Sequence, residues 1–383
     1  MHGDRGNVVR WRAALGFIPL CVAAMATAMV NDFIEYWSAA SLLLRGGNPY
    51  SPADLLAAQT AVGWSQSMPL VMWNPPWTLP FLLPFGFLSF ETAQFLWFLL
   101  HTLIIFHGAR LLWQIYCGDP RKSRIAWLSA LAFAPSYFVL LMGQIGPLIL
   151  LGLVGFVYFA KRTAWGLAGV SLVLALVKPH LSYLLWLALL LDALKEHRWR
   201  ALGGVVGAGI IIATIPLLLN SKIYAQYLQL FESDRVIRTG EWATPSLGVV
   251  LGEFLAVQGN WIRWLPTAIG TLWFLWYYGS RRAESWDWIA QLPLILLVSV
   301  TTASFVWTFD YIILLPAVVQ SAVWLGKIQR PSSRMSMIAV YLAMNGLLLV
   351  SRFFVANDFW YFWTAPAFLA LYLRVKTAAR VGE

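Results

Sequence analysis

The chain has 383 residues, of which 60% are hydrophobic and only 11% are charged. Soluble domains carry about 25% charged residues, so this composition excludes a soluble globular domain and indicates a helical protein that crosses a membrane many times. We attribute the net charge of +10 at pH 7 to Lys and Arg in cytoplasmic loops. Nucleic-acid binding is excluded because no basic run is long enough to form a footprint.

Apolar runs along the chain predict about twelve transmembrane helices in an all-α bundle, several of them shorter than the ~20 residues of a perpendicular crossing. We expect one membrane domain over residues 1–383, with a core at 12–375. The predicted spans are 13–30, 92–116, 125–141, 148–160, 164–177, 181–194, 201–219, 262–280, 288–308, 311–326, 335–353 and 360–374.

The apolar segment 70–90 is interrupted by four prolines, which break helices because they lack a backbone donor. If this segment does not cross, and the N-terminus is inside, 19 of the 27 Lys and Arg lie on the cytoplasmic side. A crossing would move every later basic cluster outside and violate the positive-inside rule. We therefore predict a broken or re-entrant segment, a plasma-membrane location and cytoplasmic termini, with the long loops 31–75 and 220–261 and the active site on the outer face.

The first outer loop is predicted to be structured. Residues 33–44 form a short amphipathic helix that ends at Gly46-Gly47, and a second helix starts at Ser51-Pro52. Such helices lie on the membrane surface. Asp32 directly precedes the first of them and has two compatible interpretations. It caps the helix in a capping box with Glu35, or it is a catalytic carboxylate at the membrane surface.

Two further polar positions on the outer side are candidates for binding an anion. Lys178 either snorkels to the interface or holds an anionic group such as a lipid phosphate. His180 assists it or is a hydrogen-bonded structural residue. Asp310 either pairs with an outer cation or faces a polar cavity, because an unpaired carboxylate is costly there. Gln144 is a helix-end hydrogen bonder or a site residue.

Arg235 and Arg238 belong to a polar stretch of the second long outer loop. They form a solvated loop face or contact the acceptor or a lipid headgroup. The sequence contains no Gly-rich phosphate loop, no His-x-x-x-His pair and no Asp-x-Asp motif. We therefore expect no metal site, and no cofactor is evident.

The order and spacing of several short motifs resemble glycosyltransferase family 87, over roughly residues 12–375. This family belongs to the GT-C superfamily of polyprenyl-phosphate-sugar-dependent enzymes. The motifs that carry the resemblance are Asp32-Phe33-x-x-Tyr36-x-x-Ala39-Ala40, Gly47-Asn48-Pro49-Tyr50, Asn74-Pro75-Pro76, Gly143-Gln144, Lys178-Pro179 and Trp307-x-x-Asp310 followed by Leu314-Leu315-Pro316.

The resemblance implies a GT-C-like fold, a polyprenyl-phosphate mannose donor, a lipid or glycan acceptor and a catalytic Asp at Asp32. Lys178 matches the Lys-Pro motif. Family members often have His after the Asp of the late motif, where this chain has Tyr311. The supporting or acceptor-binding residues expected around this chemistry are Glu35, Tyr36, Asn48, Gln144, Asp310, Arg235 and Arg238.

A competing interpretation is a transporter or flippase of lipid-linked saccharides, which shares intramembrane polar residues and broken helices. Against it, the two halves of the chain are unlike each other, and the polar residues gather at one face instead of the midplane. The sequence therefore favours a transferase.

The topology can be tested with a reporter fused after Asp119. We expect a cytoplasmic signal, because the basic cluster that follows this residue should remain inside. A signal from the outer side would show that residues 70–90 cross the membrane.

Overall fold

The computed structural model describes residues 31–233, 236, 242–256, 259–355 and 357–381. The predicted span 13–30 lies outside these residues. Over the described ranges the chain forms α-helices and short 3-10 helices, and no strand is found. The predicted all-α class is therefore confirmed.

The chain divides into two compact units. Unit 1 comprises Met1–Thr102, Tyr137–Gln144 and Pro216–Val236, and unit 2 comprises Leu103–Ser136, Ile145–Ile215 and Ile237–Glu383. The single membrane domain over residues 1–383, with its core at 12–375, remains a prediction.

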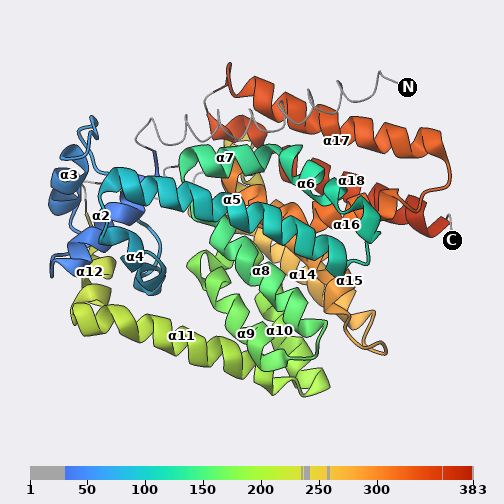
Figure 1. Cartoon of the computed structure of the whole chain (residues 1–383), viewed down its shortest axis with the longest axis horizontal. Coiled ribbons are helices and arrows are strands. Elements are labelled where there is room, and N and C mark those ends of the chain that lie inside the picture. Colours follow the sequence, from blue (N-terminus) through green and yellow to red (C-terminus); the bar gives the residue numbers. More distant parts are fainter. Residues whose placement is uncertain (1–30, 234–235, 237–241, 257–258, 356, 382–383) are drawn as a thin grey trace, which may run out of the picture. The chain divides into compact units, whose positions relative to one another are not determined.

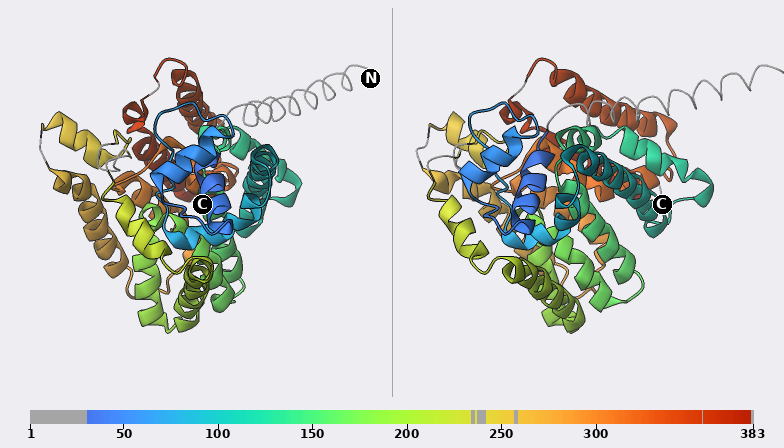
Figure 2. Two further views of the ribbon diagram at one scale, coloured as in Figure 1. Left: turned by 90° about the vertical axis from the view of Figure 1, so that its left-hand side faces the viewer. Right: turned by 60° about the vertical axis from the view of Figure 1, so that its left-hand side comes forward.

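Unit 1 consists mainly of short helices. They lie close together in all three views of Figures 1 and 2. A long helix, α5, leads out of this unit into unit 2. The elements are α2 (Phe33–Leu44), α3 (Pro52–Thr60), η1 (Pro76–Phe81), α4 (Leu83–Gly86), the start of α5 (Phe90–Ile115) and α12 (Ile223–Leu230).

Unit 2 contains most of the long apolar helices. Its elements, besides the later part of α5, are η2 (Pro120–Lys122), α6 (Arg124–Leu131), α7 (Ala134–Met142, shared with unit 1), α8 (Gly146–Ala160), α9 (Trp165–Ser171), η3 (Leu172–Val177), η4 (Pro179–Ser182), α10 (Tyr183–Glu196), α11 (Trp199–Leu219, shared with unit 1), α13 (Leu247–Phe254), η6 (Asn260–Trp264), α14 (Leu265–Gly279), α15 (Trp288–Thr302), η7 (Thr308–Leu314), α16 (Leu315–Leu325), α17 (Pro331–Ser351), η8 (Asp358–Tyr361) and α18 (Thr364–Val381).

Four helical segments among the described residues are long and apolar enough to cross a membrane: Phe90–Ile115, Trp199–Leu219, Thr308–Leu325 and Pro331–Ser351. A fifth arises if α6 and α7, bent by 59° at their junction, are counted as one span. Every other predicted span after residue 90 coincides with a shorter helix or helix pair. The count of twelve is therefore not confirmed, although the positions of the apolar helices are.

The bend between α6 and α7 is stabilised from another helix. The side-chain oxygen of Asn345 in α17 accepts a hydrogen bond from the backbone N–H of Ala134 at 2.8 Å. That N–H begins α7 and has no carbonyl of its own helix to bond. The amide therefore satisfies a backbone donor that the bend would leave unpaired.

The segment 70–90 contains no long helix. It forms η1 and α4, and Pro80 lies inside η1. Gly86 at the end of α4 packs directly on α2, since a Cβ there would lie 2.8 Å from the carbonyl carbon of Ala40. The broken character of this segment agrees with the prediction, whereas its path through the membrane remains a prediction.

The loop after residue 30, which the sequence predicts to lie outside, forms the two predicted helices. Helix α2 spans Phe33–Leu44, the chain turns at Gly46 with φ +75°, and Ser51 caps α3 by accepting the N–H of Asp54. The predicted amphipathic character of α2 was wrong. Residues on all of its faces are buried, from Phe33 through Ser41, because the rest of unit 1 surrounds it. Helix α2 is therefore a core helix of unit 1, whereas the sequence predicted a helix on the membrane surface.

The contact of Gly86 with α2 yields a test of the packing of unit 1. Gly86→Ala should lower the free energy of unfolding by about 1–3 kcal/mol, because the new methyl group meets backbone atoms that cannot move aside. The matched control is Gly203→Ala in α11, where a Cβ meets nothing within 4 Å and helix propensity favours alanine. Thermal unfolding of both purified variants measures the difference, and equal melting temperatures would contradict this packing.

Candidate active site

Asp32 lies half-buried at the start of α2, but it does not cap the helix. Its backbone is already helical, with φ −59° and ψ −14°, and its side chain makes no capping hydrogen bond. The side-chain oxygen of Asn31 accepts the N–H of Phe33 instead, at 3.2 Å. The capping-box interpretation of Asp32 was therefore wrong, because the preceding amide takes that position.

The Asp32 carboxylate accepts a hydrogen bond from Gln144 in the same unit. The Nε2 of Gln144 lies 2.9 Å from Oδ2 of Asp32, and the Oε1 of Gln144 accepts the hydroxyl of Tyr36 at 2.8 Å. Because Tyr36 donates to the amide oxygen, the amide nitrogen must face the carboxylate. Tyr36 and Gln144 are both buried, so Asp32 is held by a directed hydrogen-bond relay.

The Gly143-Gln144 pair owes its position to the backbone. Gly143 has φ +69°, and a Cβ there would lie 2.7 Å from Oδ1 of Asn31 and 2.8 Å from Cβ of Phe33. Its carbonyl accepts the indole N–H of Trp97 at 2.8 Å. Only glycine combines this left-handed conformation with so close an approach, and the turn brings Gln144 to Asp32.

Glu35 and Asn48, two further predicted site residues, also belong to unit 1. Glu35 is buried in α2, one turn after Asp32. The side chain of Asn48 accepts the N–H of Tyr50 at 2.9 Å and so forms the turn before α3. In this turn Asn48 acts on its own backbone, which is typical of Asn in loops.

Lys178 and Asp310 meet in unit 2, although 132 residues separate them. Nζ of Lys178 lies 2.8 Å from Oδ1 of Asp310, and the side chains are 13% and 1% exposed. The other carboxylate oxygen accepts the N–H of Trp307 at 3.0 Å. Of the two alternatives for Asp310, pairing with a cation is the one that the structure contains. Lys178 keeps a small exposed surface from which it can also bind an anion.

His180 lies close to this ion pair, in η4. Burial is the main cause that lowers the pKa of His180 to about 4, Asp310 opposes the shift, and Lys178 adds to it. This shift favours the neutral ring at pH 7. His180 can offer a phosphate one N–H donor but no positive charge.

A second ion pair flanks the same turn of the chain and was not predicted. Arg352 contacts the carboxylate of Asp358 and donates to the hydroxyl of Thr308 at 2.9 Å. Asp358 also accepts the backbone N–H and the hydroxyl of Thr308 at 3.1 and 2.9 Å. Thr308 precedes Asp310 by two residues, so this network fixes the start of η7. Arg352 and Asp358 flank the connection between α17 and η8. This closeness in the sequence is the local signal of their pairing.

Tyr311 stands where the sequence resemblance led us to look for His. Its side chain is completely buried, and among the described residues its hydroxyl finds no hydrogen-bond partner. Arg235 and Arg238 lie outside the described residues. The described part of the chain contains no group of three or more His, Cys, Asp or Glu that could hold a metal ion.

The predicted site residues thus form two clusters, each within its own unit. Asp32, Tyr36 and Gln144 form the cluster of unit 1, which we call the carboxylate cluster. Lys178, His180 and Asp310 form that of unit 2, which we call the cation cluster. Chemically, the first cluster contains a carboxylate, and the second contains an ammonium group paired with a carboxylate.

A comparison with protein families assigns the chain to a family. The sequence profile of glycosyltransferase family 87 matches residues 73–284, which is more than half of the chain. The chain belongs to glycosyltransferase family 87. The match includes Gln144 and Lys178, whereas Asp32 and Asp310 lie outside it. Neither a curated protein nor a solved structure is significantly similar to the chain.

The Lys178–Asp310 pair can be tested by a double-mutant cycle with Lys178→Met and Asp310→Asn. Each single change should lower the free energy of unfolding by about 3 kcal/mol, because it leaves a buried charge without its partner. The double variant should lose clearly less than the sum.

The control for this cycle is the pair of Lys122 and Asp119, 3.9 Å apart with side chains 64% and 45% exposed. Its coupling should be below about 1 kcal/mol. Chemical unfolding in lipid-free detergent measures both cycles. Additive losses at Lys178 and Asp310 would show that the two side chains do not interact.

Proposed function

We propose that this glycosyltransferase transfers a hexose from a polyprenyl-phosphate donor to a lipid-linked or cell-envelope glycan. The proposed hexose is mannose, and the proposed site of transfer is the outer face of the plasma membrane. The observation that carries the proposal is family membership together with the relay that holds Asp32. A transferase of this kind needs a general base for the acceptor and a cation for the donor phosphate. The carboxylate cluster of unit 1 contains a candidate for the first role, and the cation cluster of unit 2 contains a candidate for the second.

Asp32 is proposed as the general base. An acceptor hydroxyl attacks the anomeric carbon of the sugar, and its proton passes to the Asp32 carboxylate. General base catalysis of this kind is worth about 10²–10⁴-fold in rate. The amide of Gln144 donates to Oδ2 of Asp32 at 2.9 Å and thereby orients the carboxylate, while the buried hydroxyl of Tyr36 keeps the amide from rotating.

Lys178 is proposed to bind the donor phosphate. As the bond between the anomeric carbon and the phosphate oxygen breaks, its electron pair stays on the phosphate, whose negative charge increases. A charge-assisted hydrogen bond from Lys178 stabilises that charge in the transition state. Asp310 holds the ammonium in place at 2.8 Å, and the neutral ring of His180 adds a hydrogen-bond donor.

Two finer features complete the proposal. About twelve spans, with the shorter apolar helices crossing as well, would place both long loops outside and both termini inside. Glu35 and Asn48, with Arg235 and Arg238 of the second long outer loop, would support or contact the acceptor. The polyprenyl phosphate is a good leaving group, so the transfer would need no nucleotide.

A transporter of lipid-linked saccharides remains the alternative class, and the family match argues against it. Radiolabelled polyprenyl-phosphate mannose separates the two activities. A transferase places the label in a new glycosidic bond, whereas a transporter moves it across the membrane unchanged.

Asp32→Asn should abolish this transfer and leave the protein folded, because asparagine keeps the size of the side chain but cannot accept the proton. The matched control is Asp54→Asn, an exposed carboxylate in the same loop, which should retain the parent rate. Label transfer in membranes measures the activity, and the melting temperature of purified protein measures folding. An Asp32→Asn variant with the parent rate would refute the role of Asp32.

A further inference from the structure

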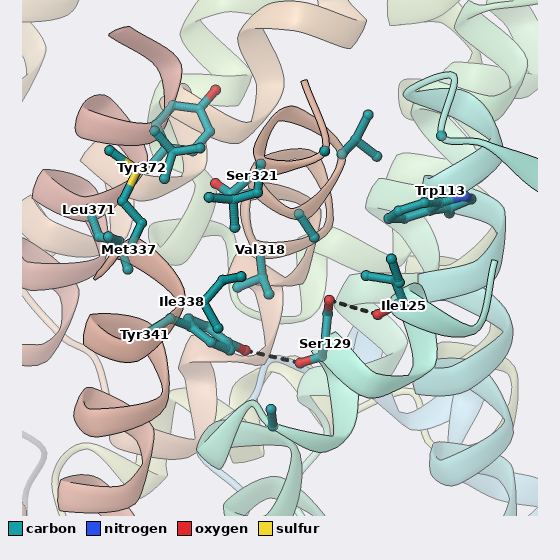
Figure 3. Close-up of a pocket in the computed structure, with 18 of the residues that line it drawn as sticks. Trp113, Ile125, Ser129, Val318, Ser321, Met337, Ile338, Tyr341, Leu371 and Tyr372 are labelled. Carbon is teal, nitrogen blue, oxygen red and sulfur yellow. Dashed lines mark hydrogen bonds between the residues drawn. The ribbon is translucent and has the colours of Figure 1, made fainter. Parts of the chain in front are cut away.

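Unit 2 contains an apolar cavity of about 800 Å³ that none of the proposed catalytic residues lines. The later part of α5 and helices α6, α16, α17 and α18 form its walls, as Figure 3 shows. Side chains such as Val318, Ile338 and Leu371 point into it. Its volume lies in the range of roughly 300–1,000 Å³ that is typical of ligand sites.

Two hydroxyl-bearing side chains in the wall of this cavity, Ser129 and Tyr341, have hydrogen-bond partners within the protein. Ser129 donates its hydroxyl to the carbonyl of Ile125 at 2.8 Å, and Tyr341 donates to the carbonyl of Ser129 at 3.0 Å (Figure 3). These hydroxyls therefore do not select a polar ligand. The middle of the cavity is suited to a hydrocarbon chain.

One end of the cavity is basic. Lys122, Lys327 and Arg334 line it; they come from the connection before α6, the connection after α16 and the first turn of α17. Figure 1 shows these chain segments at the same end of the helices, on the right. Asp119 also lines this end, 3.9 Å from Lys122. Among the described residues that line this end, three cations stand against one carboxylate, and this excess of positive charge suits an anionic headgroup.

We propose that this cavity binds an acidic phospholipid. Its phosphate would contact Lys122, Lys327 and Arg334, and an acyl chain would lie along the apolar wall. Basic pockets between transmembrane helices commonly hold anionic headgroups of the cytoplasmic leaflet. The sugar donor is a different amphiphile, because its phosphate is assigned to Lys178, which is not part of this cavity.

The test compares the full-length protein with the variant Lys122→Gln/Lys327→Gln/Arg334→Gln. Both are delipidated in neutral detergent and titrated with phosphatidylglycerol or phosphatidylcholine of the same acyl chains, and bound lipid is counted by native mass spectrometry. The parent should prefer phosphatidylglycerol. Each removed cation should weaken that binding about fivefold, and all three together on the order of 100-fold.

Two further variants separate the headgroup from the chain. Arg121→Gln/Arg124→Gln/Arg330→Gln removes the same charge from the same connections at exposed positions that do not line the cavity, and it should bind like the parent. Ala322→Trp fills the cavity and keeps every cation, and it should bind less phosphatidylglycerol.

Several outcomes would overturn the proposal. The first is an equal loss of phosphatidylglycerol binding in both Gln variants. The others are equal binding of the two lipids by the parent and unchanged phosphatidylglycerol binding by Ala322→Trp. If the parent binds neither phospholipid, or if the lipid that copurifies in this cavity is a polyprenyl phosphate, the cavity has another occupant. The lipid-binding experiment does not measure the synthesis of polysaccharide or glycolipid. Failure of the lipid proposal therefore leaves the proposed transfer reaction untouched.

Discussion

Buried charges constrain this protein more than any other feature, because a carboxylate among apolar helices needs a partner. Three carboxylates of unit 2 meet this need with a cation. Asp310 pairs with Lys178, Asp358 with Arg352, and Asp192 with Arg198, and each carboxylate is at most 6% exposed. The carboxylates of the first two pairs fix the start of η7, because they accept the adjacent N–H groups of Trp307 and Thr308.

Asp32 belongs to a different environment from these three. It lies half-buried, and the donor that reaches it from Gln144 is a neutral amide. A neutral donor orients a carboxylate while stabilising its charge less than a cation does. The glycine turn at Gly143 is the backbone feature on which this orientation depends.

Much of the candidate site could be predicted, but the partners of its residues could not. The motifs drew attention to Asp32, Gln144, Lys178 and Asp310 one at a time. The capping box was wrong because Asn31 and Asp32 are both good capping residues, and local sequence does not choose between adjacent candidates. The amphipathic prediction for α2 was wrong because periodicity cannot show that neighbours bury every face.

The sequence by itself determined the membrane class, the all-α fold, the positions of most helices and the two short helices of the first outer loop. These properties follow from local composition, prolines, glycines and caps, which act over a few residues. Only the tertiary structure decided that Gln144 reaches Asp32 over 112 positions and that Lys178 reaches Asp310 over 132. Such pairs form when packing brings distant helices together, and the buried charges then select the partners that compensate them.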